Sequence, residues 1–213
     1  MRATQYLIAS LSLVSALAVS PAAKATTLDF SDLASGACNF VGSSVASGGF
    51  NFVDGSGPDG GLFLCNAGVL QHNTTPAMVS ANGTGVITLS SVGGGSFSLQ
   101  SFFAGTRTED FNPDAPSAYY GQATGISILG ALTGGGFVSD HISFVGLQFD
   151  MFTLVGTFTG LDSVTFTTDG PGPANEFMIN NIVVNAAVPE PASLALLAVG
   201  LAGIGMIRRR QTR

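Results

Sequence analysis

The sequence has no tryptophan, and between its two ends it has almost no positive charge. Residues 26–187 contain one cationic side chain, Arg107, against twelve aspartates and glutamates, which gives this segment a formal charge of −11. Phosphate binding depends on lysine and arginine, so this segment is not expected to bind nucleic acid. An acidic surface favours solubility, and binding of divalent cations is the alternative interpretation.

Motifs of common catalytic sites are also missing. The two histidines, His72 and His141, have no cysteine or glutamate cluster at metal-ligand spacing, which argues against a transition-metal site. No G-x-S-x-G and no H-E-x-x-H motif occurs. Two carboxylates for glycoside hydrolysis can be chosen from twelve acidic residues, but a sequence does not show their separation. We therefore predict a protein without catalysis. A glycan hydrolase is an alternative hypothesis.

The N-terminus has the features of a secretory signal peptide. Arg2 precedes the apolar run Tyr6–Ser20, and Ala23-Lys24-Ala25 fits the small-x-small pattern of a cleavage site. A first transmembrane helix is the alternative, but the run is short for a span. We expect export through the secretion translocon and removal of residues 1–25, which leaves a body of residues 26–187.

Only two cysteines occur, Cys38 and Cys65, and both lie in the body. Export places them in an oxidising compartment, where an even number of cysteines indicates a disulfide. Two buried thiols are the alternative. We predict a Cys38–Cys65 bond, which would also remove a thiol nucleophile.

The body is predicted to be all-β, an antiparallel β-sandwich or jelly roll. Helix formers are scarce, since the body lacks lysine and has two glutamates, whereas all sixteen phenylalanines lie within it. The glycine-rich stretches are also typical of disorder, but the phenylalanines supply apolar area to bury. Short apolar or alternating runs recur between turn signals. These runs are residues 49–53, 61–65, 85–92, 96–103, 125–132, 140–158, 162–169 and 176–184.

Two of these runs predict different environments. In residues 162–169, Val164 and Phe166 share one face while Ser163, Thr165 and Thr167 take the other, as in a strand with one wet side. In contrast, the run "FMINNIVV" is apolar almost throughout, as in a central strand covered on both faces.

The C-terminal tail, residues 188–213, has three parts. Pro189 and Pro191 flank Glu190 and separate the body from an apolar segment. That segment ends at Ile207 and, as a transmembrane helix, would be about 25 Å long. Arg208, Arg209 and Arg210 follow, and such a cluster holds a C-terminus in the cytoplasm.

The order Val188-Pro189-Glu190-Pro191, apolar helix, arginine cluster resembles the PEP-CTERM sorting signal. The resemblance implies processing by exosortase, a membrane cysteine protease that cleaves near the Pro-Glu-Pro element. It also implies a precursor anchored in the inner membrane, then a cell-surface or extracellular protein of a Gram-negative bacterium that produces exopolysaccharide and biofilm matrix. An ordinary C-terminal anchor is the alternative, and it does not explain Pro-Glu-Pro.

The body more loosely resembles sandwich domains common in PEP-CTERM proteins, through "SFSLQSFFAG", "LDSVTFTTDG" and "FMINNIVV". Related domains often have Asp-Asn-Ile where this chain has Asn180-Asn181-Ile182. The missing acid weakens any ligand role transferred to Asn180. Some such domains bind carbohydrate, so a lectin-like module is the alternative function.

Two acidic loops and a tyrosine pair are candidate binding elements. Calcium prefers carboxylate and carbonyl oxygens, which glycine-rich acidic loops can supply, although ordinary acidic turns are the alternative. The first loop carries Asp54 and Asp59, and the second loop carries Glu109, Asp110 and Asp114. These five residues are the candidate calcium ligands. Tyr119 and Tyr120 follow the second loop and are candidate sugar contacts, with a packed loop as the alternative.

Overall fold

The computed structural model describes the body of the chain as strands joined by turns. The described residues are 24–33, 38–57, 60–66, 75–81, 85–106, 121–145, 149–154, 156–170 and 175–186, all within one compact unit, Lys24–Ala186. No helix long and apolar enough to cross a membrane occurs among these residues. The expected signal helix and C-terminal transmembrane helix lie outside them.

Fourteen strands form in the described part of the chain. They are β1 (Lys24–Leu28), β2 (Cys38–Gly42), β3 (Ser44–Ser47), β4 (Phe50–Asp54), β5 (Gly61–Cys65), β6 (Ala77–Ala81), β7 (Val86–Ser91), β8 (Phe97–Thr106), β9 (Gly121–Gln122), β10 (Gly125–Leu132), β11 (Phe137–Ser143), β12 (Phe149–Thr153), β13 (Leu161–Asp169) and β14 (Asn175–Ala186).

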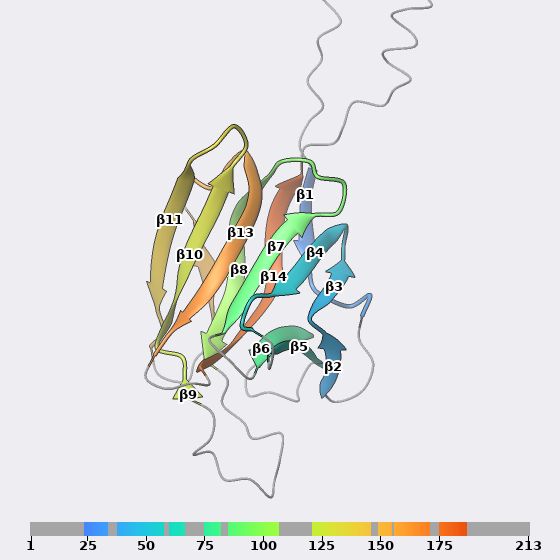
Figure 1. Cartoon of the computed structure of the whole chain (residues 1–213), viewed down its shortest axis with the longest axis vertical. Helices are drawn as coiled ribbons and strands as arrows, with labels where there is room; N and C mark the ends of the chain where they lie inside the picture. Colours follow the sequence, from blue (N-terminus) through green and yellow to red (C-terminus); the bar gives the residue numbers. More distant parts are fainter. Residues whose placement is uncertain are drawn as a thin grey trace, which may run out of the picture. The chain divides into compact units, whose positions relative to one another are not determined.

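The strands form two layers. The β13 sheet has the order β11-β10-β13-β7-β4-β3, and the β14 sheet has the order β2-β5-β6-β14-β8-β12. The pair Leu161–Phe97 joins β13 to β8 and so connects the layers. Figure 1 shows β8, β14 and β1 behind the layer of β10, β13, β7 and β4. The predicted antiparallel β-sandwich is thus confirmed; β9 pairs with β14 in parallel.

The interior between the layers is apolar. Alternate residues of β13 and β7 point inward and are buried, among them Val164, Phe166, Ile87 and Leu89. Burial of each such side chain contributes about 1.5–3 kcal/mol relative to exposure. Aromatic contacts reinforce the core, and Phe102 packs edge-on against Phe166 with ring centroids 5.3 Å apart.

A second buried cluster lies on the outer face of the β14 sheet. It consists of Cys65, Ala77, Val79 and Met178, with Cys38, Phe63 and Phe149 packed against it. Successive residues of β14 alternate between the two clusters, since Phe177 and Ile179 belong to the interior and Met178 to the outer face. The strand is therefore buried on both sides, as its continuous apolar sequence predicts.

Strand β14 changes partner along its length. Its residues Phe177–Ile179 pair with β6, and its residues Ile182–Ala186 pair with β1, while β8 pairs along the other edge. Asn181 has a φ of 44°, and the register with β8 shifts between Asn180 and Val183. This irregularity separates the two halves of the strand, so that two shorter strands share one edge of β14.

Candidate functional site

The two ends of the body lie side by side. β1 pairs antiparallel with β14, so that Lys24 faces Ala186, Ala25 faces Asn185 and Thr26 faces Val184. The expected signal cleavage after Ala25 therefore falls within strand β1, which begins at Lys24. Val188, Pro189, Glu190, Pro191 and the arginines 208–210 lie outside the described residues.

The anchoring of the N-terminal segment begins beyond that cleavage position. Leu28 and Phe30 are almost completely buried in the interior. Leu28 approaches Gly48 so closely that a Cβ on Gly48 would lie 2.5 Å from the leucine Cδ2, and Gly48 has a φ of +56°. Asp32 accepts hydrogen bonds from the Ser47 hydroxyl at 2.6 Å and from the Gly48 amide at 3.1 Å. These contacts hold the segment independently of Lys24 and Ala25.

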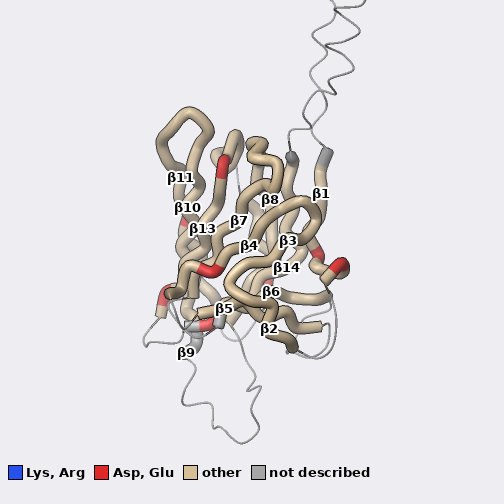
Figure 2. Tube along the Cα trace, turned by 45° about the vertical axis from the view of Figure 1, so that its right-hand side comes forward, with Lys and Arg blue, Asp and Glu red and all other residues tan. Residues whose placement is uncertain are grey.

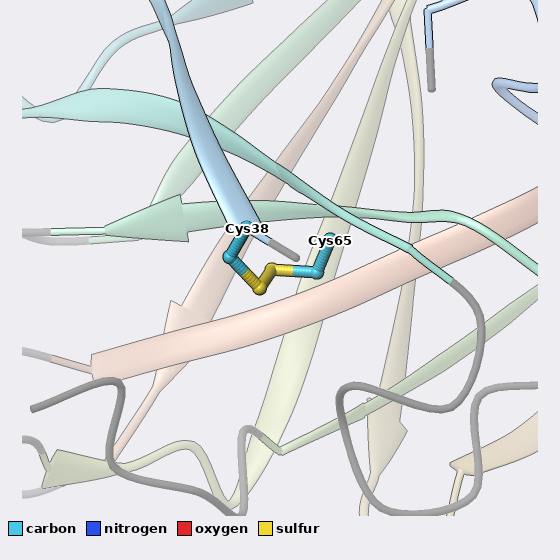
Figure 3. The surroundings of a disulfide bond; sticks show 2 residues. All are labelled: Cys38 and Cys65. Carbon is cyan, nitrogen blue, oxygen red and sulfur yellow. A yellow bond between two sulfur atoms is a disulfide. The ribbon is translucent and has the colours of Figure 1, made fainter. Parts of the chain in front are cut away.

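The structure has the predicted disulfide between Cys38 and Cys65, as Figure 3 shows. The two cysteines face each other directly in the register of β2 and β5. Cys65 is fully buried and belongs to the outer cluster of the β14 sheet. The bond therefore connects the edge strand β2 to the rest of its sheet, and no free cysteine remains among the described residues.

Asp54 is the one candidate calcium ligand in the described part of the chain. Its Oδ1 accepts hydrogen bonds from the Ser56 hydroxyl at 2.7 Å and, more weakly, from Ser80 at 3.4 Å. Its Oδ2 is buried without a hydrogen-bond partner, beside Gly60, where a Cβ would collide with it. Among the described residues, no three His, Cys, Asp or Glu side chains gather in a way that could hold a metal ion.

The other four candidate ligands, Asp59, Glu109, Asp110 and Asp114, lie outside the described residues, as do Tyr119 and Tyr120. Five of these six residues lie in residues 107–120, and the structure describes the residues on either side of that segment. Thr106 ends β8 opposite Phe177, and Gly121 begins β9 opposite Asn175. Calcium and sugar contacts at these loops therefore stay predictions.

His141 and Asp169 form a short hydrogen bond that the sequence analysis did not anticipate. His141 Nε2 lies 2.5 Å from Asp169 Oδ2, and Ser127 donates to Asp169 Oδ1 at 3.3 Å. β10 lies between β11 and β13, and its Ser127 faces His141 and Thr167. The serine binds the aspartate rather than the histidine, so the group lacks the serine–base contact of a nucleophilic triad. Twenty-eight residues separate His141 from Asp169, and only strand register reveals the pair.

Asn180 is a buried polar residue on the outer face of the β14 sheet. Its Nδ2 donates to Thr75 Oγ1 at 2.6 Å, and its Oδ1 is buried without a partner. Neighbouring positions on that face carry Met178 and Phe103, and Phe103 stacks on Phe149 with centroids 5.9 Å apart. The side chain thus has a structural contact with Thr75.

The outer face of the β13 sheet is uncharged over two adjacent rows of side chains, which we call the neutral strip. In strand order from β11 to β3, one row is Ser139, Leu129, Thr165, Thr88, Val53 and Ser44, and the other is Phe137, Ala131, Ser163, Ser90, Asn51 and Ala46. Six strands at about 4.8 Å spacing make the strip roughly 24 Å long.

Seven of the twelve side chains in this strip carry a hydroxyl or amide group. Thr88 and Thr165 share a hydrogen bond of 3.1 Å. At the β3 end a shallow hollow of about 490 Å³ is lined by Ser44, Val45, Ala46, Asn51, Val53 and Ser90. At the β11 end Phe137 is 70% exposed. Figure 2 marks acidic positions elsewhere on the described body.

Comparison with known proteins identifies the tail and gives a distant likeness for the body. The PEP-CTERM protein-sorting motif matches residues 187–210. No functionally curated protein matches the chain. A variant of the CBM29-2 carbohydrate-binding module in complex with cellulohexaose matches at 18% identity and a TM-score of 0.42, over 79% of this chain and 98% of that chain.

Two further solved structures are similarly distant. CBM29_1, a family 29 carbohydrate-binding module from Piromyces equi, has 12% identity and a TM-score of 0.42, over 78% of this chain and 92% of that chain. An arabinose-bound α-L-arabinofuranosidase has 11% identity and a TM-score of 0.38, over 77% of this chain and 25% of that chain. Identities and TM-scores this low transfer neither ligand nor activity. The chain is therefore a PEP-CTERM sorting-signal protein, identified by its tail, with a β-sandwich body.

Proposed function

We propose that this chain is an exported bacterial surface or extracellular-matrix protein whose precursor is processed at both ends. It passes the secretion translocon, loses residues 1–25, and is held in the inner membrane by its apolar tail until exosortase releases it. The observation that carries this proposal is the sorting motif at residues 187–210. The motif begins directly after Ala186, the last residue of strand β14.

Intact mass and cell fraction of the native protein test this proposal. In a host with the sorting protease, the product should lack residues 1–25 and the arginines 208–210 and should leave the inner membrane. Without the protease, the tail should be retained. A double substitution, Pro189→Ala with Pro191→Ala, should also retain it, whereas Arg213→Ala is a matched control outside the tripartite pattern. A wild-type product that keeps Arg208–Arg210 in the inner membrane contradicts the proposal.

The role we assign to the body is non-catalytic association with exopolysaccharide or biofilm matrix. Both cysteines are bonded to each other, and Ser127 donates to Asp169 instead of to His141. Neither arrangement supplies an activated nucleophile. Hydrolysis of the host's own polysaccharide by the purified body would support the glycan hydrolase reading instead.

A second candidate function, a lectin-like carbohydrate-binding module, is favoured by the neutral strip. Its serine, threonine and asparagine side chains can exchange hydrogen bonds with sugar hydroxyls. The exposed ring of Phe137 offers an apolar surface at one end. A body with twelve acids and one arginine repels polyanions, so we expect weak binding of neutral glycans, or of anionic glycans bridged by calcium.

Retention of the body on the host's polysaccharide tests this second function. Phe137→Ala and Asn51→Ala should each weaken retention, and neither should change the melting temperature much. Phe40→Ala is a matched control, since Phe40 is 62% exposed but belongs to β2, in the other sheet. Tyr119→Ala and Tyr120→Ala test the loop contacts in the same assay. If the wild-type body is not retained, with or without calcium, the lectin-like function is contradicted and only the structural role remains.

Calcium binding at the acidic loops is a separate part of the proposal, and the buried, unpartnered Asp54 Oδ2 supports it. A ligand that binds only the folded state at a hundredfold excess over Kd stabilises it by about 2.7 kcal/mol. The melting temperature should therefore rise in millimolar calcium relative to chelator. Asp54→Asn should reduce that rise, and an equal melting temperature in both conditions contradicts calcium binding.

A further inference from the structure

The expected signal-cleavage position and the start of the sorting motif border the same pair of strands. Lys24 faces Ala186 and Ala25 faces Asn185 at the end of the β1–β14 ladder. In an antiparallel pair, the chain that precedes one strand and the chain that follows the other leave from the same end. The body therefore connects to both of its processed segments at one end of one strand pair, as the adjoining ends of β1 and β14 in Figure 1 show.

Cleavage after Ala25 shortens β1 without releasing it. The remaining strand residues, Thr26–Leu28, still face Val184, Val183 and Ile182. Leu28 and Phe30 remain buried, and Asp32 keeps its hydrogen bonds to Ser47 and Gly48. Ala25 is exposed, so its loss costs no burial in the interior. The cut is therefore compatible with a folded body.

The same cut changes the surroundings of the residues that directly precede the sorting motif. Asn185 and Ala186 pair with Ser98 and Phe97 of β8 on one side and with Ala25 and Lys24 on the other. Loss of Lys24 and Ala25 leaves their β8 side paired and opens the other edge. Extended substrates are commonly bound by strand addition at a free sheet edge, because unpaired backbone groups are available there.

We propose that removal of the signal peptide permits the sorting cleavage by uncovering the β1-facing edge of Asn185 and Ala186. This inference rests on the proposed processing at both ends. The first cleavage hydrolyses the Ala25–Thr26 peptide bond, and water supplies the oxygen of the Ala25 carboxylate and the proton of the Thr26 amine. While that bond is intact, β1 occupies the edge beside the motif and excludes the sorting protease. After hydrolysis, the edge can pair with the protease.

A tyrosine moved by one position tests the order of the two cleavages. Ala25→Tyr places a large residue where signal cleavage needs a small one, whereas Lys24→Tyr places it at the unrestricted middle position. Both changes introduce a good strand former into β1. We expect tail cleavage of the Ala25→Tyr precursor to fall at least tenfold and that of Lys24→Tyr to stay within twofold of wild type. The absence of free thiols, from the Cys38–Cys65 bond, verifies export and folding in each variant.

A second variant separates edge coverage from simple retention of the signal peptide. Thr26→Pro with Thr27→Pro, added to Ala25→Tyr, removes backbone donors from β1 but keeps Leu28, Phe30 and Asp32. Tail cleavage should return to within about threefold of wild type although the signal peptide stays attached. Wild-type tail cleavage in Ala25→Tyr, or no recovery in the proline variant, overturns the inference. No tail cleavage in the wild type instead overturns the proposed function on which the inference rests.

Discussion

The outer faces of the two sheets differ although both belong to one sandwich. On the β13 sheet, outward residues such as Thr88, Thr165 and Ser163 are polar and partly exposed. On the β14 sheet, the outward residues Val79 and Met178 are almost completely buried. A strand in the first sheet therefore needs apolar side chains at alternate positions, whereas a central strand of the second needs them at nearly every position.

This difference shows that the sequence pattern of a strand depends on whether one or both of its faces are buried. β13 has the period of two that a half-buried strand requires, and β14 has the continuous apolar run of a strand covered on both faces. One polar residue of this run, Asn180, is buried and has Thr75 as a hydrogen-bond partner. Buried polar groups require such partners because desolvation without one is costly.

The largest expected effect contrasts two apolar side chains on the two outer faces. Met178→Ala should lower the free energy of unfolding by about 2–5 kcal/mol, because it leaves a cavity in a buried cluster. Leu129→Ala, at a site on the other sheet that is 45% exposed, should cost less than about 1 kcal/mol. Chemical denaturation of both variants measures the difference, and equal losses would remove the distinction between the faces.

The disulfide stabilises the sheet whose outer face is buried. Cys38→Ala with Cys65→Ala should destabilise the body by about 3 kcal/mol, since the bond closes a loop across a sequence separation of 27. Reduction of the wild-type protein should have a similar effect on the denaturation midpoint. If neither change moves the midpoint, the bond does not contribute to the stability of this sheet.

A polar contact on each face gives a smaller, matched contrast. Thr75→Val removes the acceptor of the buried Asn180 Nδ2 and should cost about 1–3 kcal/mol. Thr165→Val removes the partly exposed bond to Thr88 and keeps a β-branched strand former, so it should stay within about 0.5 kcal/mol. Both values come from the same denaturation measurement, and a reversed order would contradict the assigned burial.

The smallest expected effect concerns the turn that follows β1. It measures how much an exposed polar contact contributes to the stability of the body. The Ser31 hydroxyl donates to Asp29 at 2.8 Å, and this hydrogen bond, with one from the Ser31 amide, lowers the pKa of Asp29 from its ordinary 3.8. A lowered folded-state pKa stabilises the fold above pH 3.8, and this contribution is lost as the pH falls through the folded-state value.

Ser31→Ala should therefore cost about 0.5 kcal/mol or less at pH 7, because solvent screens an exposed contact. The difference from wild type should shrink as the pH falls from 7 toward 2, because protonation of Asp29 removes the charged hydrogen-bond acceptor. Unfolding curves at the two pH values measure it. A difference that grows on acidification would contradict the lowered pKa.

Much of the fold was predictable because periodicity and turn residues are local signals. Residues 61–65 and 125–132 match β5 and β10 residue for residue. The predicted run of residues 140–158 is instead two strands, β11 and β12, which belong to different sheets. Its apolar residues continue across the connection, so the sequence has no break in hydrophobicity where the chain crosses between layers.

Five strands were not anticipated, and each lacks a strong local pattern. β2, β3 and β6 are short and contain serine, glycine or alanine, and β9 has two residues. β1 begins inside the predicted signal-peptide cleavage pattern, which concealed its role as a strand. These segments become strands because a longer neighbour provides backbone partners and burial, which a local sequence window does not contain.

The sequence by itself determined the sorting tail, the all-β class, the acidic charge and the pairing of the only two cysteines. These depend on composition, short motifs and periods of two, all of which are properties of neighbouring residues. Only the tertiary structure brought Lys24 beside Ala186, His141 beside Asp169, and twelve uncharged side chains onto one face. Strand order and register decide those contacts, because they arise from burying both sheets together, and no residue encodes its distant partner alone.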